Sequence, residues 1–76
     1  MKRKVSKMGV NYNKLFKILD KEKMTKTQFR EALGISTSTL AKISSNRPVT
    51  LDIIERICIH FDVKIEDVLE FDNSKN

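Results

Sequence analysis

Residues 25–43 read TKTQFREALGISTSTLAKI, and this segment sets the fold of the 76-residue chain. Thr25 is followed three positions later by Gln28, which is the spacing of a capping box at a helix N-terminus. Gly34 supplies the left-handed backbone that readily ends a helix, and Ser36 is a favourable N-cap for the next helix. The segment therefore predicts two short helices, at 25–33 and 36–45, joined by a tight turn.

Apolar residues recur at helical spacing on both sides of this pair. Asn11 and Thr50 are favourable N-caps for a first and a fourth helix. Including a short fifth helix, the further helices are expected at 11–21, 50–61 and 65–70. The apolar residues expected to face inward are Tyr12, Leu15, Phe16, Leu19, Phe29, Ala32, Leu33, Ile35, Leu40, Ile43, Ile54, Ile57, Cys58, Phe61, Ile65, Val68 and Leu69.

No run of alternating apolar and polar residues predicts a strand, so the expected fold class is all-α. The chain has room for one small domain, which we place at 11–71. We expect residues 1–10 to be a flexible basic arm and residues 72–76 to be a disordered tail.

The formal charge is distributed unevenly along the chain. Residues 1–49 have a net charge of +9, and residues 50–76 have a net charge of −4. The cationic part attracts phosphate, which points to nucleic acid as a partner.

The single cysteine fits a reducing cytosol, and no apolar run approaches the roughly 20 residues of a membrane span. The basic start is not followed by an apolar segment, so we expect no signal peptide and a cytoplasmic protein that is not membrane-bound.

Reactive side chains form no catalytic or metal-binding pattern in the sequence. His60 has no Cys or His at metal-ligand spacing, and Cys58 lies on the apolar side of the 50–61 helix. The adjacent Glu66 and Asp67 are better explained as partners of the positive end of a helix than as an acid–base pair. We therefore expect no enzymatic activity, no metal and no cofactor.

The joint order of these features resembles the helix-turn-helix regulators of the Cro and lambda-repressor type (the XRE family), a group found in bacteria and their phages. The resemblance covers about residues 11–71 and is closest to a short single-domain subgroup. It is carried by the Thr25 cap, Phe29 with Ala32-Leu33, the Gly34-Ile35-Ser36 turn, Leu40 with Ile43, the Thr50-capped helix and the closing Ile65-Glu66-Asp67-Val68-Leu69-Glu70-Phe71.

This resemblance implies a compact five-helix, lambda-repressor-like domain that binds duplex DNA and regulates transcription. The helix at 36–45 would read the major groove, with base contacts from Thr37, Ser38 and Lys42 and with Ser36 close by. The expected phosphate contacts are Lys26, Thr27, Ser45, Asn46 and Arg47. A lysine can donate to guanine O6 and N7, whereas hydroxyls discriminate bases weakly. The arm cations Lys2, Arg3, Lys4 and Lys7 would track the backbone or enter a minor groove.

Several alternatives stay open at this point. Arg30 stands where the family has a small residue between the two helices, so either its guanidinium extends to solvent or the helix pair is spaced differently. Each hydroxyl or cation also fits helix capping or a solvated surface. The same fold suits a protein-interaction module, such as an antitoxin or an antagonist of another regulator, that uses the acidic C-terminal half or Phe71 with Val68. A homodimer would form through the fourth and fifth helices or on the DNA.

Overall fold

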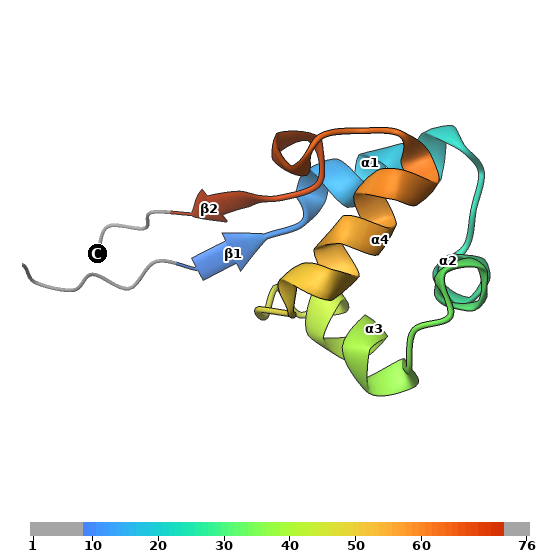
Figure 1. Cartoon of the computed structure of the whole chain (residues 1–76), viewed down its shortest axis with the longest axis horizontal. Helices are drawn as coiled ribbons and strands as arrows, with labels where there is room; N and C mark the ends of the chain where they lie inside the picture. The colour runs from blue at the N-terminus through green and yellow to red at the C-terminus, as the bar shows by residue number, and fades with distance from the viewer. Residues whose placement is uncertain (1–8, 73–76) are drawn as a thin grey trace, which may run out of the picture.

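A computed structural model describes residues 9–72, which form four α-helices and a two-stranded sheet (Figure 1). The four helices match the predicted ones to within one or two residues at each end. The elements in chain order are β1 (Gly9–Asn11), α1 (Asn13–Lys21), α2 (Lys26–Leu33), α3 (Thr37–Ser44), α4 (Leu51–Phe61), the 3-10 turn η1 (Ile65–Asp67) and β2 (Glu70–Asp72).

Side-chain hydrogen bonds cap α2, α3 and α4 as predicted. The Thr25 hydroxyl accepts from the Gln28 amide at 3.0 Å, and the Gln28 side chain accepts from the Thr25 amide at 2.8 Å, which closes a capping box. Ser36 and Thr50 each accept from the amide three residues on, at 3.1 and 3.4 Å. Each such cap is worth about 1 kcal/mol, which helps short helices to begin at defined residues.

The turn between α2 and α3 also follows the prediction. Gly34 adopts the left-handed conformation (φ 66°) at the C-cap of α2. Beyond it, the Ile35 amide donates back to the Arg30 carbonyl at 3.1 Å, and the Ile35 side chain is buried. This turn therefore directs the chain into the N-cap of α3 while anchoring it to the core.

The start of α1 differs from the prediction. Asn11 is the last residue of β1, and Tyr12 takes the N-cap position without a side-chain cap. The Asn11 Oδ1 accepts from the Asn13 amide at 2.9 Å, which closes a local turn. Asn11 does not cap the helix because its backbone belongs to the sheet, where it pairs with Glu70.

The predicted fifth helix at 65–70 is wrong. Only η1 forms, because the chain makes a single tight turn in which the Val68 amide donates to the Ile65 carbonyl at 2.9 Å. The Asp67 carboxylate accepts from the Lys64 amide at 3.1 Å and fixes the start of this turn. The next residues, Glu70–Asp72, then form the strand β2.

The all-α expectation is corrected to a mostly helical fold with a small sheet. β1 and β2 pair antiparallel, with Gly9 opposite Asp72, Val10 opposite Phe71 and Asn11 opposite Glu70. This β-ribbon projects from the helical body on the side opposite α2 (Figure 1). Residues 9 and 10, expected in the arm, and residue 72, expected in the tail, therefore belong to the domain. Residues 1–8 and 73–76 lie outside the described residues.

The core draws on every helix and on the segment before β2. It consists of Tyr12, Leu15, Leu19, Phe29, Leu33, Ile35, Ile43, Ile54, Ile57 and Val68. Phe29 and Phe61 stack with their ring centroids 6.3 Å apart, which joins α2 to α4. Two residues expected to face inward, Ala32 and Ile65, are exposed.

Within residues 9–72, no helix is long and apolar enough to cross a membrane.

Candidate nucleic-acid interface

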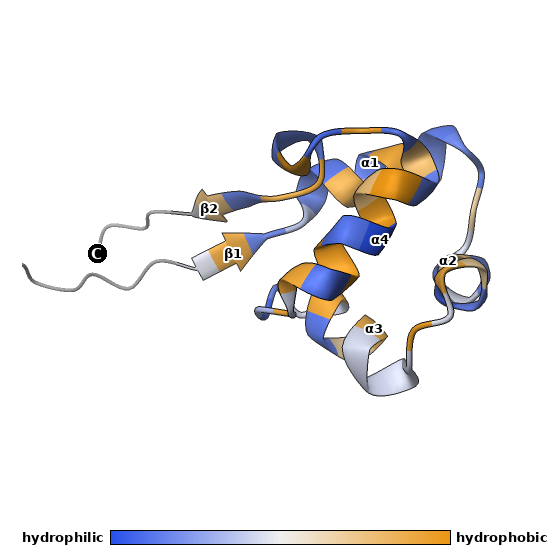
Figure 2. Cartoon of the chain, in the orientation of Figure 1, coloured by the Kyte–Doolittle hydropathy of each residue, from blue (hydrophilic) through white to orange (hydrophobic). Residues whose placement is uncertain are grey.

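The predicted base-contacting residues lie on the exposed side of α3. Ile43 is fully buried and holds the helix against the core, whereas Thr37, Ser38 and Lys42 are exposed. Figure 2 shows the start of α3 as pale, because its hydroxyl residues are near neutral hydropathy. Helix α3 therefore presents small polar groups and one cation outward.

The four predicted base contacts differ in what they already bind. The Ser36 hydroxyl caps α3 and also lies 3.0 Å from the hydroxyls of Ser38 and Thr39. Among residues 9–72, no hydrogen bond or ion pair engages the side chains of Thr37 and Lys42. Thr37 and Lys42 are therefore the two groups of this set that are free to meet an external partner.

The start of α2 carries the first predicted phosphate contacts. Lys26 and Thr27 are both exposed, at the first and second positions of the helix. The first turns of α1, α2 and α3 contain no acidic residue, whereas that of α4 contains Asp52. Because free amides and the helix dipole make an N-terminus positive, the uncompensated ends of α2 and α3 favour an anion.

The loop after α3, residues 45–50 and called the α3 loop below, carries the other predicted phosphate contacts. The Ser45 hydroxyl donates to the Ala41 carbonyl at 2.7 Å, so its proton is already used within the helix end. The Asn46 Oδ1 accepts from the Tyr12 amide at 3.1 Å. Arg47 is exposed, and within the described residues its guanidinium forms no ion pair. Of the three predicted phosphate contacts in the α3 loop, Arg47 is therefore the one whose side chain is not already bonded within the described residues.

Two residues in this region, Tyr12 and Arg56, form contacts that the sequence does not predict. The sequence predicts Tyr12 only as an inward-facing residue of the first helix, yet its hydroxyl donates to the Arg47 carbonyl at 2.7 Å. Arg56 donates to the Leu33 carbonyl at 3.5 Å at the end of α2 and lies 3.4 Å from the Asp52 carboxylate. The only signal for Tyr12 in the sequence is that a buried phenol requires a hydrogen-bond partner; no such signal exists for Arg56.

Arg30 follows the first of the two expected alternatives. Its side chain is 29% exposed, and its guanidinium reaches the surface, where it lies 3.8 Å from the Glu31 carboxylate. An exposed pair of this kind contributes little to stability. The long side chain is therefore accommodated by extending outward from α2.

Comparisons with known proteins identify domains that are similar to this one. The family of Cro/C1-type HTH DNA-binding domains matches residues 14–74. The chain belongs to this family. A solved structure described as transcriptional regulator VanUg, form II, is similar to the Cro/C1-type domain with a TM-score of 0.87 and 35% identity over 97% of this chain and 99% of that chain. A comparison with curated proteins gives no match.

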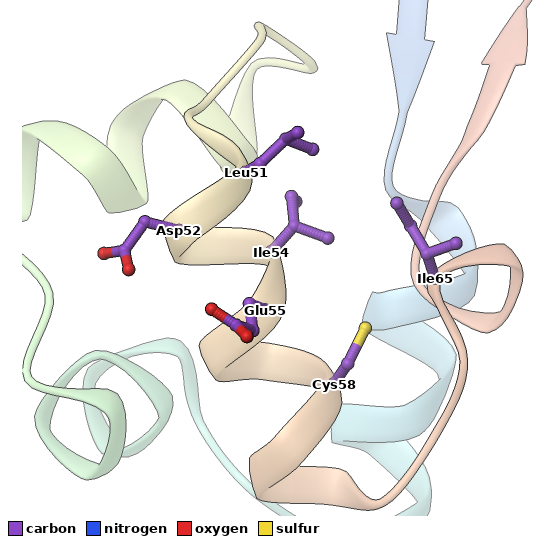
Figure 3. Close-up of a pocket in the computed structure, with 6 residues that line it drawn as sticks. All are labelled: Leu51, Asp52, Ile54, Glu55, Cys58 and Ile65. Atoms are coloured by element: carbon purple, nitrogen blue, oxygen red, sulfur yellow. The ribbon is translucent and has the colours of Figure 1, made fainter.

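Outside α2 and α3, this Cro/C1-type domain has a shallow apolar groove. Leu51, Ile54 and Cys58 of α4 lie on one side and Ile65 of η1 on the other (Figure 3). Leu51 is 75% exposed. Asp52 and Glu55 of α4 also line this groove, so carboxylates adjoin its apolar residues.

The described part of the domain contains no cluster of His, Cys, Asp or Glu that would hold a metal ion. Cys58 is half-buried, and burial, reinforced by the negative charge of Asp67, raises the pKa of its thiol. His60 is exposed and packs edge-on against Phe61 at 4.8 Å between ring centroids. A raised thiol pKa lowers the thiolate fraction, which is the opposite of what a nucleophilic cysteine requires.

Proposed function

We propose that this Cro/C1-type domain is a sequence-specific transcriptional regulator that reads the major groove of DNA with the helix at 36–45. The observation that carries the proposal is the exposed side of α3, where Thr37 and Lys42 form no side-chain hydrogen bond with any other residue from 9 to 72. An α-helix fits the major groove, and Lys42 can donate there to guanine O6 and N7. Thr37 adds a hydroxyl and a methyl group, which can contact a thymine methyl.

The proposed phosphate contacts flank this helix on two sides. Lys26 and Thr27 act from the start of α2, with the free amides of that helix end. Arg47 acts from the α3 loop, together with the Nδ2 of Asn46, whose Oδ1 is already bonded. Ser45 would contact a phosphate by turning its hydroxyl away from the Ala41 carbonyl, because its amide is bonded within the helix end. These contacts would set the position of the domain on the duplex, while α3 would set the sequence preference.

The decisive experiment combines site selection with a salt titration. Random duplex DNA is selected for binding, and the affinity for the enriched site is then measured between about 50 and 200 mM salt. We expect a defined motif and an affinity that falls steeply with salt. Absence of binding at low salt, or binding with no salt dependence, would refute the proposal.

We further propose that two copies bind together on DNA, because small groove-reading domains gain useful affinity by pairing on two half-sites. The pairing surface would be formed by α4 and by the segment of η1 and β2, where Leu51 and Phe71 are 75% and 68% exposed. A palindromic selected motif and a two-to-one complex in sedimentation would support this. A single half-site with a one-to-one complex would exclude it.

A second candidate function is a protein-interaction module, and the same exposed apolar residues favour it. Leu51, Ile59, Ile65 and Phe71 are exposed large apolar residues, whereas Val68, expected to form a contact surface with Phe71, is fully buried and cannot do so. This candidate would be favoured if a partner protein co-purifies with the chain, if the complex survives nuclease treatment, and if the chain shows no affinity for duplex DNA. Duplex binding without a co-purifying partner would favour the regulator. For both functions we infer a cytoplasmic location.

A further inference from the structure

Tyr12 connects the start of α1 to the α3 loop through two hydrogen bonds. Its hydroxyl donates to the Arg47 carbonyl at 2.7 Å, and its amide donates to Asn46 Oδ1 at 3.1 Å. The residue is 1% exposed and its ring lies in the core. A rigid, buried group therefore holds two consecutive residues of a loop that is 34 and 35 positions away in sequence.

Asn46 contributes a second constraint on the same loop. It has a positive φ of 58°, and its amide donates to the Ile43 carbonyl at 3.2 Å while the Arg47 amide donates to the Lys42 carbonyl at 2.8 Å. These two bonds form a Schellman ending, for which glycine is the usual residue. Glycine would lack the side-chain oxygen that receives the Tyr12 amide, so asparagine meets both requirements at this position.

The constrained backbone leaves the Arg47 side chain exposed. Within the described residues its guanidinium forms no ion pair, although the backbone of the same residue is bonded at both its amide and its carbonyl. Binding is weakened by any loop ordering that must occur on association. A loop that is already fixed presents its cation without that loss.

We propose that Tyr12 is a positioning residue for DNA binding: it fixes the backbone of Asn46 and Arg47 so that the Arg47 guanidinium is presented to the phosphates beside α3. Tyr12 itself, being buried, touches no DNA. This inference rests on the proposed function and adds to it a buried residue on which a surface contact depends.

A double-mutant cycle tests this dependence. Duplex affinity and its salt dependence are measured for the unmodified chain, Tyr12→Phe, Arg47→Ala and the double variant, well below the unfolding midpoint of each. We expect Tyr12→Phe to weaken binding about fivefold, the equivalent of one net hydrogen bond. In the Arg47→Ala background the same change should have almost no effect, because the group that it positions is absent.

Matched variants separate positioning from a general loss of stability. Ile57→Val removes one methylene from the core, where Ile57 is fully buried, and should leave duplex affinity unchanged. Asn46→Gly keeps the left-handed backbone but removes the acceptor of the Tyr12 amide. Because Asn46 Nδ2 is itself a proposed phosphate contact, this variant is judged by hydrogen exchange and not by affinity. Hydrogen exchange of the Arg47 amide should accelerate in both Tyr12→Phe and Asn46→Gly, with α4 amides unchanged.

The outcomes distinguish this inference from the proposed function. If the unmodified chain lacks duplex affinity, the proposed function fails and this role of Tyr12 fails with it. If the chain binds DNA but Tyr12→Phe weakens binding equally with and without Arg47, the positioning role alone is overturned. An equal loss in Ile57→Val, or an unchanged exchange rate at the Arg47 amide, overturns it as well.

Discussion

The ammonium of Lys26 lies over the ring of Phe16, with Nζ 5.0 Å from the ring centroid. A cation at the first position of a helix is unfavourable, because it adds to the positive end of the helix dipole. The face of an aromatic ring offsets part of this repulsion. A bound phosphate would offset this repulsion further, which agrees with the proposed phosphate contact of Lys26.

Lys26→Ala should therefore weaken binding to all duplexes by a similar factor and reduce the salt slope by about one. The free energy of unfolding should stay the same or rise slightly, because the unfavourable charge is removed. Salt titrations on the selected site and on an unrelated duplex check the first expectation, and urea unfolding checks the second. Lys17→Ala, an exposed lysine within α1, is the control. A loss confined to the selected site would contradict the proposed phosphate contact.

Lys42→Ala should lower discrimination between the selected site and a base-substituted site by about 1–3 kcal/mol, the usual value of a specific base contact. Thr37→Ala should also lower it, by less, because hydroxyls distinguish bases weakly. Competition binding with the two duplexes measures the difference directly. Ser44→Ala, at an exposed position near the end of α3, serves as the comparison. If Lys42→Ala weakens both duplexes equally, Lys42 contacts phosphate and not a base.

Gly34→Ala should destabilise the domain by about 1–2 kcal/mol, because Gly34 has a φ of 66° and an L-residue with a Cβ is strained there. A Cβ at this position would meet no atom within 4 Å, so the cost is one of backbone conformation and not of packing. Gly9→Ala, which also meets nothing within 4 Å and has no positive φ, should change stability much less. Thermal unfolding of the two variants compares them. A D-alanine at position 34, introduced by synthesis, should restore the stability.

Folding stability should fall as the solution becomes alkaline. Burial raises the pKa of the Cys58 thiol, with the charge of Asp67 adding to the shift. Burial also raises the pKa of the Tyr12 phenol, although the nearby backbone of Val49 opposes part of this shift. Because the folded state favours both neutral forms, their contribution is complete below the ordinary thiol pKa of about 8.5 and is lost as pH rises through the raised values.

Urea unfolding from pH 7 to pH 10.5 measures this dependence. Cys58→Ala should flatten the part of the curve just above the ordinary thiol pKa, and Tyr12→Phe the more alkaline part. A curve unchanged by Cys58→Ala would show that the thiol has the same pKa in both states.

The sequence predicted the helices and the turn between α2 and α3 because their signals are local. Each helix cap or turn residue acts on backbone groups within one helical turn, as Thr25 does with Gln28, and as Gly34, Ser36 and Thr50 do. A short stretch of sequence therefore contains all the residues that determine where these helices begin and end. The exposed side of α3 followed from the same periodicity. These signals place the predicted contact residues on the exposed sides of α2 and α3, where the structure also has them.

The parts that the sequence did not predict depend on distant pairs. Val10 and Phe71 pair across the sheet although most of the chain separates them, and strands of three residues are too short to show alternation. The 65–70 segment has helical spacing, but its last residue is recruited by β1. Tyr12 could not be linked to Asn46 and Arg47 because that contact exists only once α1 and the α3 loop are packed together.

The β-ribbon gives the domain a direction of mechanical weakness. Gly9 and Asp72 face each other at the end of the ribbon that lies farthest from the helices (Figure 1). A force that pulls Gly9 and Asp72 apart therefore acts on one residue pair of the ribbon at a time. The pairs separate in sequence before tension reaches the helices. Because Asn11 directly precedes Tyr12, the load on β1 then passes to the residue that holds the α3 loop, while the Lys14–Glu70 ion pair still joins α1 to β2.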